Sequence, residues 1–370
     1  MSTNPRIYLD HNATSPLVEP ARHAMTQALG DLGNPSSIHA EGRRVRDRIE
    51  RARNQVAALF GRPREQVVFT SGGTEANLLG VRTLVAAATE RGLPRVIATS
   101  ALEHPSLRSA VDGTGWEVRL LDVSPDGVIR PRALDGVGVL AVAAINHELG
   151  TTLDPSVLAA ARAAGALIHV DGVQAAGKRD LAIDADSLAI SAHKIGGPQG
   201  VGAVILAIDA VAIDAETVSG GHQERGRRGG TENTLGIVGF GAAAAAVDLA
   251  SWAAVCSLGE RLEAGLCSIA DVRIHGAGAS RIGGTINAGF ANARGEAIVI
   301  ALDLAGVAAS TGAACTSGTL QPSPVLLALG QSPDGAREAV RFSLGRVNTV
   351  DEIDRVLALL PAIVARARRR

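Results

Sequence analysis

The sequence has few aromatic residues and no excess of either charge. Phe, Trp and Tyr make up 2% of the 370 residues, so the core must rest on Ala, Val, Leu and Ile. Platforms on which nucleic-acid bases could stack are therefore not expected. The formal net charge of −1 argues against a protein that mainly binds a polyanion. We predict no direct nucleic-acid partner.

Cysteines and long apolar runs are also scarce. Three cysteines cannot form a disulfide framework, and the odd number leaves at least one free thiol. The longest apolar runs, 139–145 and 241–247, are far shorter than the ~20 residues that cross a bilayer. The N-terminal residues lack the apolar segment of a secretion signal, and no Cys-x-x-Cys spacing indicates a metal site. These absences predict a cytoplasmic protein without a membrane partner or a metal.

Short apolar runs alternate with longer helix-like segments over the first 250 residues. The predicted strands are 67–70, 96–99, 139–145, 166–170, 187–191 and 201–208, with helices such as 43–60, 75–90 and 155–164 between them. This alternation predicts an α/β fold with a mostly parallel central sheet covered by helices. Towards the C-terminus the pattern changes to two helices, 252–269 and 350–368, and Gly-rich short strands. We predict a large α/β domain over 16–250 and a smaller α+β domain from 1–15 and 251–370.

Polar residues follow three of the predicted strands, at the edge where ligands bind in such sheets. The first strand runs into Gly72 and Gly73 and then into a helix that starts near Thr74. The unpaired N–H groups of a helix N-terminus suit a phosphate, and Thr74 adds a hydroxyl donor. An ordinary strand-to-helix turn capped by Thr74 explains the same residues equally well.

The other two strand ends carry an acid and an amine. Asp171 closes a buried strand, where a carboxylate needs a cation or donors, and Gln174 follows three residues later. Taken alone, Asp171 is better explained as the N-cap of the following helix. Lys194 ends the next strand inside a Gly-rich stretch, and partial desolvation would make its amine nucleophilic. The alternative is that Lys194 extends its amine into solvent, as most lysines do.

An anion-binding helix start, a carboxylate and an amine are together the three groups that bind pyridoxal 5'-phosphate (PLP) in enzymes. Lys194 would hold the aldehyde as a Schiff base, and Asp171 would keep the pyridine nitrogen protonated. The helix that starts at Thr74 would bind the phosphate group.

Eight ordered segments resemble those of the cysteine desulfurases, PLP enzymes of fold type I in the class V aminotransferase group. The segments are 8–16, 34–43, 70–77, 103–105, 191–194, 228–233, 314–318 and 341–346. The long polar segment around Cys315 resembles the first of the two groups of this family, the NifS/IscS-like one.

The resemblance implies a role for each matching residue. Lys194 would be the Schiff-base lysine and the α-proton carrier, and His104 would lie over the coenzyme ring. The implied cofactor contacts are Gly73, Thr74, His104, Asp171, Gln174, Ser191, His193 and Lys194, with Thr231 from the partner of a homodimer. The implied substrate contacts are Arg341 for the carboxylate, and Asn146 or His147. His147 is a departure, because the family usually has asparagine there.

The implied reaction converts L-cysteine to L-alanine and leaves sulfur as a persulfide on Cys315. An acceptor protein, such as an iron–sulfur scaffold or a thiolation protein, would receive this sulfur. Cys256 and Cys267 lie three helical turns apart and are interpreted as core packing. Two alternatives stay open: a selenocysteine lyase or other small-substrate PLP lyase or aminotransferase, and a non-catalytic sulfur-delivery paralogue.

Overall fold

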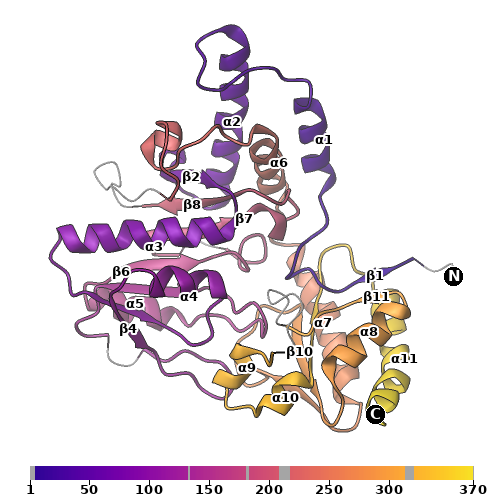
Figure 1. Cartoon of the computed structure of the whole chain (residues 1–370). Helices are drawn as coiled ribbons and strands as arrows, with labels where there is room; N and C mark the ends of the chain where they lie inside the picture. The colour runs from indigo at the N-terminus through magenta and orange to yellow at the C-terminus, as the bar shows by residue number, and fades with distance from the viewer. Residues whose placement is uncertain (1–4, 132–133, 181–182, 208–216, 313–320, 370) are drawn as a thin grey trace.

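The computed structural model describes residues 5–131, 134–180, 183–207, 217–312 and 321–369 (Figure 1). Cys315 therefore lies outside the described residues. Among the residues that are described, no helix combines the length and apolar character that crossing a membrane requires.

A seven-stranded sheet forms the centre of the larger part of the molecule. In spatial order its strands are β2 (Val67–Thr70), β8 (Gly202–Leu206), β7 (Ser187–Ser191), β6 (Leu167–Asp171), β5 (Val139–Ala143), β3 (Val96–Thr99) and β4 (Glu117–Leu120). Every strand runs parallel except β8, which is antiparallel to both β2 and β7. The prediction of a mostly parallel sheet is confirmed.

Helices cover both faces of this sheet, because its strands are apolar on both sides. One face packs against α2 (Ala40–Leu59), α5 (Pro155–Ala163) and α6 (Thr234–Ala245), and α1 (Glu19–Ala28) packs on α6. The other face packs against α3 (Gly73–Glu90) and α4 (Pro105–Asp112). Consecutive residues of a strand alternate between these layers: Leu140 and Val142 face the first, Val139 and Ala141 the second.

A second, separate core lies in the smaller part, drawn from orange to yellow in Figure 1. Its antiparallel sheet has the order β12 (Ala339–Ser343), β10 (Thr285–Phe290) and β9 (Val272–His275). One face of that sheet packs against α7 (Trp252–Cys267), α8 (Gly295–Leu304) and α11 (Val350–Ala367). Two short helices, α9 (Pro324–Ala328) and α10 (Pro333–Arg337), contribute to another cluster.

The N-terminal segment packs with this smaller part. Strand β1 (Ile7–Tyr8) pairs in parallel with β11 (Val307–Ala308), and Ile7 and Leu9 are buried in the second core. The segment then crosses to the large sheet, so that residues 10–15 lie between the two parts. The boundary at residue 250 stays a prediction.

From the sequence, one strand was missed and one cysteine was misplaced. Strand β4 was not predicted, because it is an edge strand whose residues are half-buried or exposed and carry charges. Cys267 was expected in the core, but it is exposed at the end of α7, whereas Cys256 is half-buried. Burial and the charge of Glu260 raise the pKa of the Cys256 thiol, which keeps it protonated and poorly nucleophilic.

Candidate active site

A cavity of about 240 Å³ lies at the carboxyl ends of the parallel strands β6 and β7. Asp171 is the last residue of β6 and Ser191 the last of β7, and a short 3₁₀ turn, Ala192–Lys194, follows directly. Helix α3 begins at the same edge. The lining residues are Ala13, Gly73, Thr74, His104, Ser106, Ala143, Ile145, His147, Asp171, Val173, Gln174, Ser191, His193 and Lys194. Eight of the predicted cofactor residues are thereby brought together.

The amine of Lys194 is directed to main-chain oxygens of the N-terminal segment. Its Nζ lies 2.5 Å from the carbonyl oxygen of Asn12 and 2.8 Å from that of Ala13. The lysine is half-buried and lines the cavity, so it does not extend into bulk solvent. The two carbonyls hold the amine beside the space that a coenzyme would fill.

Asp171 is buried and held by two donors. Its Oδ2 accepts a hydrogen bond from Asn77 Nδ2 at 2.8 Å, and its Oδ1 accepts one from the backbone N–H of Val173 at 2.9 Å. Asn77 is itself fixed, because its Oδ1 lies 3.0 Å from Nε2 of the buried His169. This arrangement keeps the carboxylate oriented into the cavity and compensates part of the cost of burying it.

Two imidazole rings line the cavity and contact each other. The rings of His104 and His147 meet edge to face, with centroids 5.1 Å apart. His104 is the N-cap of α4, and its Nδ1 accepts the backbone N–H of Ser106 at 3.1 Å, which leaves the proton of the neutral ring on Nε2. Burial lowers the pKa of His104, although the charge of Asp171 opposes this shift, and the pKa of His147 is lowered by burial and by the neighbouring charges of His104, Arg341 and Lys194. Near neutral pH both rings are therefore uncharged and can carry protons.

The opposite end of the cavity is suited to an anion. Thr74 and Ser191 supply hydroxyls, and the N-terminus of α3 supplies unpaired N–H groups. Gly73 must lack a side chain, because a Cβ there would lie 2.8 Å from Cγ2 of Val173. Burial, followed by the charge of Lys194, lowers the pKa of His193 to about 4, so its ring is a neutral hydrogen-bonding group.

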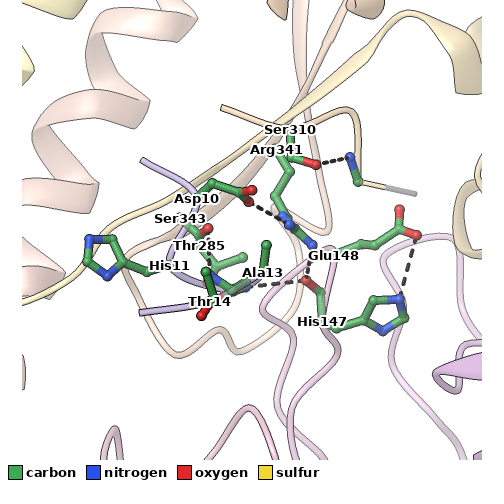
Figure 2. A network of polar contacts seen from close by, with 12 residues as sticks. Asp10, His11, Ala13, Thr14, His147, Glu148, Thr285, Ser310, Arg341 and Ser343 are labelled. Atoms are coloured by element: carbon green, nitrogen blue, oxygen red, sulfur yellow. Dashed lines mark hydrogen bonds and ion pairs between the residues drawn. The ribbon is translucent and has the colours of Figure 1, made fainter. Parts of the chain in front are cut away.

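Arg341 lies on β12 of the smaller part and reaches towards the site from behind His147. Figure 2 shows its guanidinium between Asp10 and the main chain of His147. Nη2 donates to Asp10 Oδ1 at 2.8 Å and Nη1 donates to the carbonyl oxygen of His147 at 3.0 Å. The Nε atom is buried, and none of the residues that the structure describes is its hydrogen-bond partner. Arg341 is thus fixed in orientation, with donor capacity left over.

Asn146 and His147 are placed differently. The Asn146 amide is used by the main chain: Nδ2 donates to Leu102 O at 2.8 Å, and Oδ1 accepts the N–H groups of Glu148 and Leu149 at 2.9 Å. His147 lines the cavity, whereas Asn146 borders a separate, smaller one. Of these two predicted substrate residues, only His147 lines the cavity that contains Lys194.

Thr231 does not share the cavity with Lys194. It is exposed and borders another cavity, of about 140 Å³, next to Thr70 and Ser71. The segment that carries Thr231 is anchored by a buried ion pair in which Arg53 binds Glu224 through two hydrogen bonds of 2.7 and 2.8 Å. Within one chain Thr231 thus stays apart from Lys194.

Residues that the sequence did not single out hold the site together. Asn12 carries the carbonyl next to Lys194, Asn77 holds Asp171, and Lys178 donates to Gln174 Oε1 at 3.0 Å. Glu103 is buried beside His104, and burial raises its pKa to about 7. Glu103 and Asn77 stand in segments that resemble the family, which was the available signal.

The residues that line the cavity fit PLP. One amine, one oriented carboxylate and an anion-binding helix end converge on a single space, and neutral imidazoles lie beside them. In the part of the chain that is described, no group of three or more His, Cys, Asp or Glu side chains is arranged to hold a metal ion.

Comparison with known proteins also points to a PLP-binding family. The family described as "Aminotransferase class-V" matches residues 7–356. A protein of Enterobacter agglomerans named "Cysteine desulfurase" is 40% identical over 98% of this chain and 93% of its own length. The chain belongs to the cysteine desulfurases of the class-V aminotransferase family.

Solved structures extend the similarity to the fold. A structure titled "NIFS-LIKE PROTEIN" is 28% identical, covers 97% of this chain and 99% of its own, and has a TM-score of 0.87. Another, titled "SspA in complex with cysteine", is 25% identical with a TM-score of 0.78, over 93% of this chain and 100% of its own. The PLP fold type I and the cysteine desulfurase family predicted from the sequence are confirmed. As a member of the class-V aminotransferase family, the protein is a PLP-dependent enzyme.

Proposed function

We propose that this cysteine desulfurase transfers the sulfur of L-cysteine to its own Cys315. The Cys315 thiolate attacks the substrate sulfur, a sulfur–sulfur bond forms, and the carbon–sulfur bond of the substrate breaks. The substrate carbon takes up a proton, so L-cysteine and one thiol give L-alanine and one persulfide without an external oxidant. The observation that carries this proposal is the convergence of Lys194, Asp171 and His104 on one cavity in a chain of this family.

The side chains around the cavity divide the work by position and charge. Bound PLP supplies an electron-withdrawing ring that stabilises negative charge at the substrate α-carbon. Lys194 holds the coenzyme and moves the α-proton with its amine. His104 carries its proton on Nε2, and its neutral ring can give or take one as sulfur leaves. Asp171 keeps its carboxylate oriented through Asn77.

Arg341 would bind the substrate carboxylate. Its guanidinium is planar, and after binding Asp10 and the His147 carbonyl it keeps donors that no described residue uses. That carbonyl fixes Arg341 relative to the cavity into which the His147 ring projects. His147 would then contact the substrate from the same side.

Incubation of the wild-type protein with L-cysteine tests the function. We expect alanine and sulfide in equal amounts when a reductant such as dithiothreitol is present, because the reductant releases sulfur from the persulfide. Without reductant, a single equivalent of alanine per active site is expected. Alanine without sulfide, or faster turnover of selenocysteine together with no reaction of cysteine, would contradict the proposal in favour of the related PLP enzymes.

A dimer and an acceptor protein complete the proposed function. Thr231 would reach the phosphate site of the partner subunit, which explains why it lies apart from Lys194 within one chain. A protein acceptor, for iron–sulfur cluster assembly or for thiolation, would take the sulfur from Cys315. A cytoplasmic location stays a prediction of the sequence.

Changing Thr231 to alanine is expected to weaken PLP retention about 10- to 100-fold, the effect of one lost hydrogen bond to a charged group. The measurement is the dissociation constant of PLP from its absorbance during dilution and dialysis. Thr217→Ala, in the same loop, is the control. A monomer with full PLP occupancy would refute the shared site.

A further inference from the structure

Lysine is rare in this chain: one lysine lines the cavity and the other contacts a residue that lines it. Of 36 lysine and arginine residues, two are lysines, Lys178 and Lys194. All other basic positions carry arginine. Lys178 is 7% exposed, and the mechanism above gives it no role. An ammonium group in this position loses most of its hydration and must be compensated by the residues around it.

The surroundings of Lys178 fit an ammonium group in three directions. Its Nζ donates to Asn12 Oδ1 at 2.8 Å and to Gln174 Oε1 at 3.0 Å. The third direction is covered by the ring of Trp252, whose centroid lies 5.5 Å from Nζ. An arginine would bring five donors to a place that offers two oxygens and one ring face.

Asn12 connects Lys178 with Lys194. The Asn12 carbonyl oxygen accepts hydrogen bonds from Lys194 Nζ at 2.5 Å and from Gln174 Nε2 at 2.9 Å. Its side-chain oxygen is held by Lys178, and its backbone N–H donates to Ser343 Oγ at 2.9 Å.

The amide nitrogen of the same residue extends the connection to the substrate side. Asn12 Nδ2 donates to the carbonyl oxygen of His147 at 3.3 Å and to Thr285 Oγ1 at 3.1 Å. The His147 carbonyl is also the acceptor for Arg341. Asn12 therefore contacts the Lys194 amine, the His147 carbonyl that also binds Arg341, and the sheet of the smaller part. Lys178 fixes the rotamer of the Asn12 side chain.

Positive charges surround Lys178. Burial, followed by the charges of Lys194, Arg341 and Arg346, lowers the pKa of Lys178 to about 7. The charge of Lys178 in turn contributes to lowering the pKa of His11. Repulsion between two lysines is mutual, so Lys178 also opposes a positive charge on Lys194.

We propose that Lys178 is a positioning residue for Lys194: it holds Asn12 and Gln174, and with them the carbonyl group that accepts the Lys194 amine. The inference rests on the proposed function, in which Lys194 carries PLP and moves a proton. Lys178 acts through Asn12 and through its charge, and does not touch the substrate.

Changing Lys178 to methionine tests this in the PLP-loaded enzyme. Methionine fills a similar volume beside Trp252 but has no charge and no donors. We expect the pH midpoint of the visible coenzyme band to rise by about half to one pH unit, because a like charge is removed. The kcat for L-cysteine should fall about 10- to 100-fold, since Lys194 is misplaced, with KM changed less than about threefold. Arg179→Met, the exposed neighbour, should change neither.

A purely structural role for Lys178 would lower the melting temperature but leave the midpoint and kcat unchanged, and that result would overturn the proposal. If Lys178→Met does not fold, Asn12→Ala tests the proposal instead. This change retains the main-chain carbonyl of residue 12 and removes the side-chain oxygen that Lys178 binds. We expect a similar loss in kcat there, and unchanged kcat would refute the link.

The double variant Asn12→Ala with Lys178→Met completes a cycle. The kcat of the double variant should be no lower than that of the more impaired single variant, because both changes break the same connection. Losses that multiply would mean independent roles and would contradict the proposal. The spectroscopic midpoint requires PLP on Lys194 but no desulfurase activity. Absence of sulfide release by the wild type would therefore contradict only the proposed function.

Discussion

Replacing Lys194 by alanine is expected to lower kcat by at least about 10⁴-fold and to remove the visible band of lysine-bound PLP. In the proposed function the amine both holds the coenzyme and moves the α-proton, so both functions would disappear together. The other lysine cannot substitute, because Lys178 is buried with Asn12 and Gln174 as its acceptors. The measurements are the absorption spectrum and the mass of the borohydride-reduced protein, which should no longer gain the mass of PLP.

Two comparisons make the Lys194 result specific. Lys178→Met should still gain the mass of PLP after reduction, which separates holding the coenzyme from positioning the amine. Methylamine added to Lys194→Ala should restore part of the proton transfer, because a small amine can enter the vacated space. A covalent PLP adduct in Lys194→Ala would show that another group holds the coenzyme and would end this assignment.

Cys315→Ala is expected to retain PLP fully and to lower sulfide release from L-cysteine by at least about 10³-fold, because the attacking nucleophile is missing. Neither of the other thiols can replace it. Burial and Glu260 raise the pKa of Cys256, and Cys267 is exposed at the far end of α7, within the smaller part of the molecule. The measurement is sulfide release at saturating cysteine, together with the coenzyme absorbance.

Cys267→Ala is the matched control, because it removes an exposed thiol without touching the site. It should release sulfide at the wild-type rate. Mass spectrometry of the wild type after one turnover without reductant should find one additional sulfur on the peptide with Cys315. Sulfide release by Cys315→Ala at the wild-type rate would disprove the acceptor role, and a persulfide on Cys267 would reassign it.

Much of the fold could be predicted because its signal is local. The strands that become β2, β3, β5, β6, β7 and β8 are mostly apolar on both faces, and such runs indicate strands buried on both sides. Strand β4 carries Glu117 and Arg119 and gives no such signal. The antiparallel direction of β8 could not be predicted either, because an apolar run has the same composition in both directions.

The candidate site was predictable where residues follow a strand end. Asp171 ends β6 and Lys194 lies in the turn directly after the neighbouring β7, and parallel strands bring their carboxyl ends to one edge. The choice between Asn146 and His147 had no such basis, since adjacent residues differ only in the side to which each side chain turns. The structure shows that the main chain uses the Asn146 amide, whereas His147 lines the cavity.

The amino-acid sequence by itself determined the alternation of strands and helices, the acid, amine and anion-binding turn, and the similarity to cysteine desulfurases, because each depends on residues close together in the chain. Only the tertiary structure decided that Asn12 meets Lys178 and Lys194, and that Arg341 lies behind His147. These contacts join residues more than 160 positions apart, and no periodicity or spacing encodes which distant side chains meet once two cores have packed together.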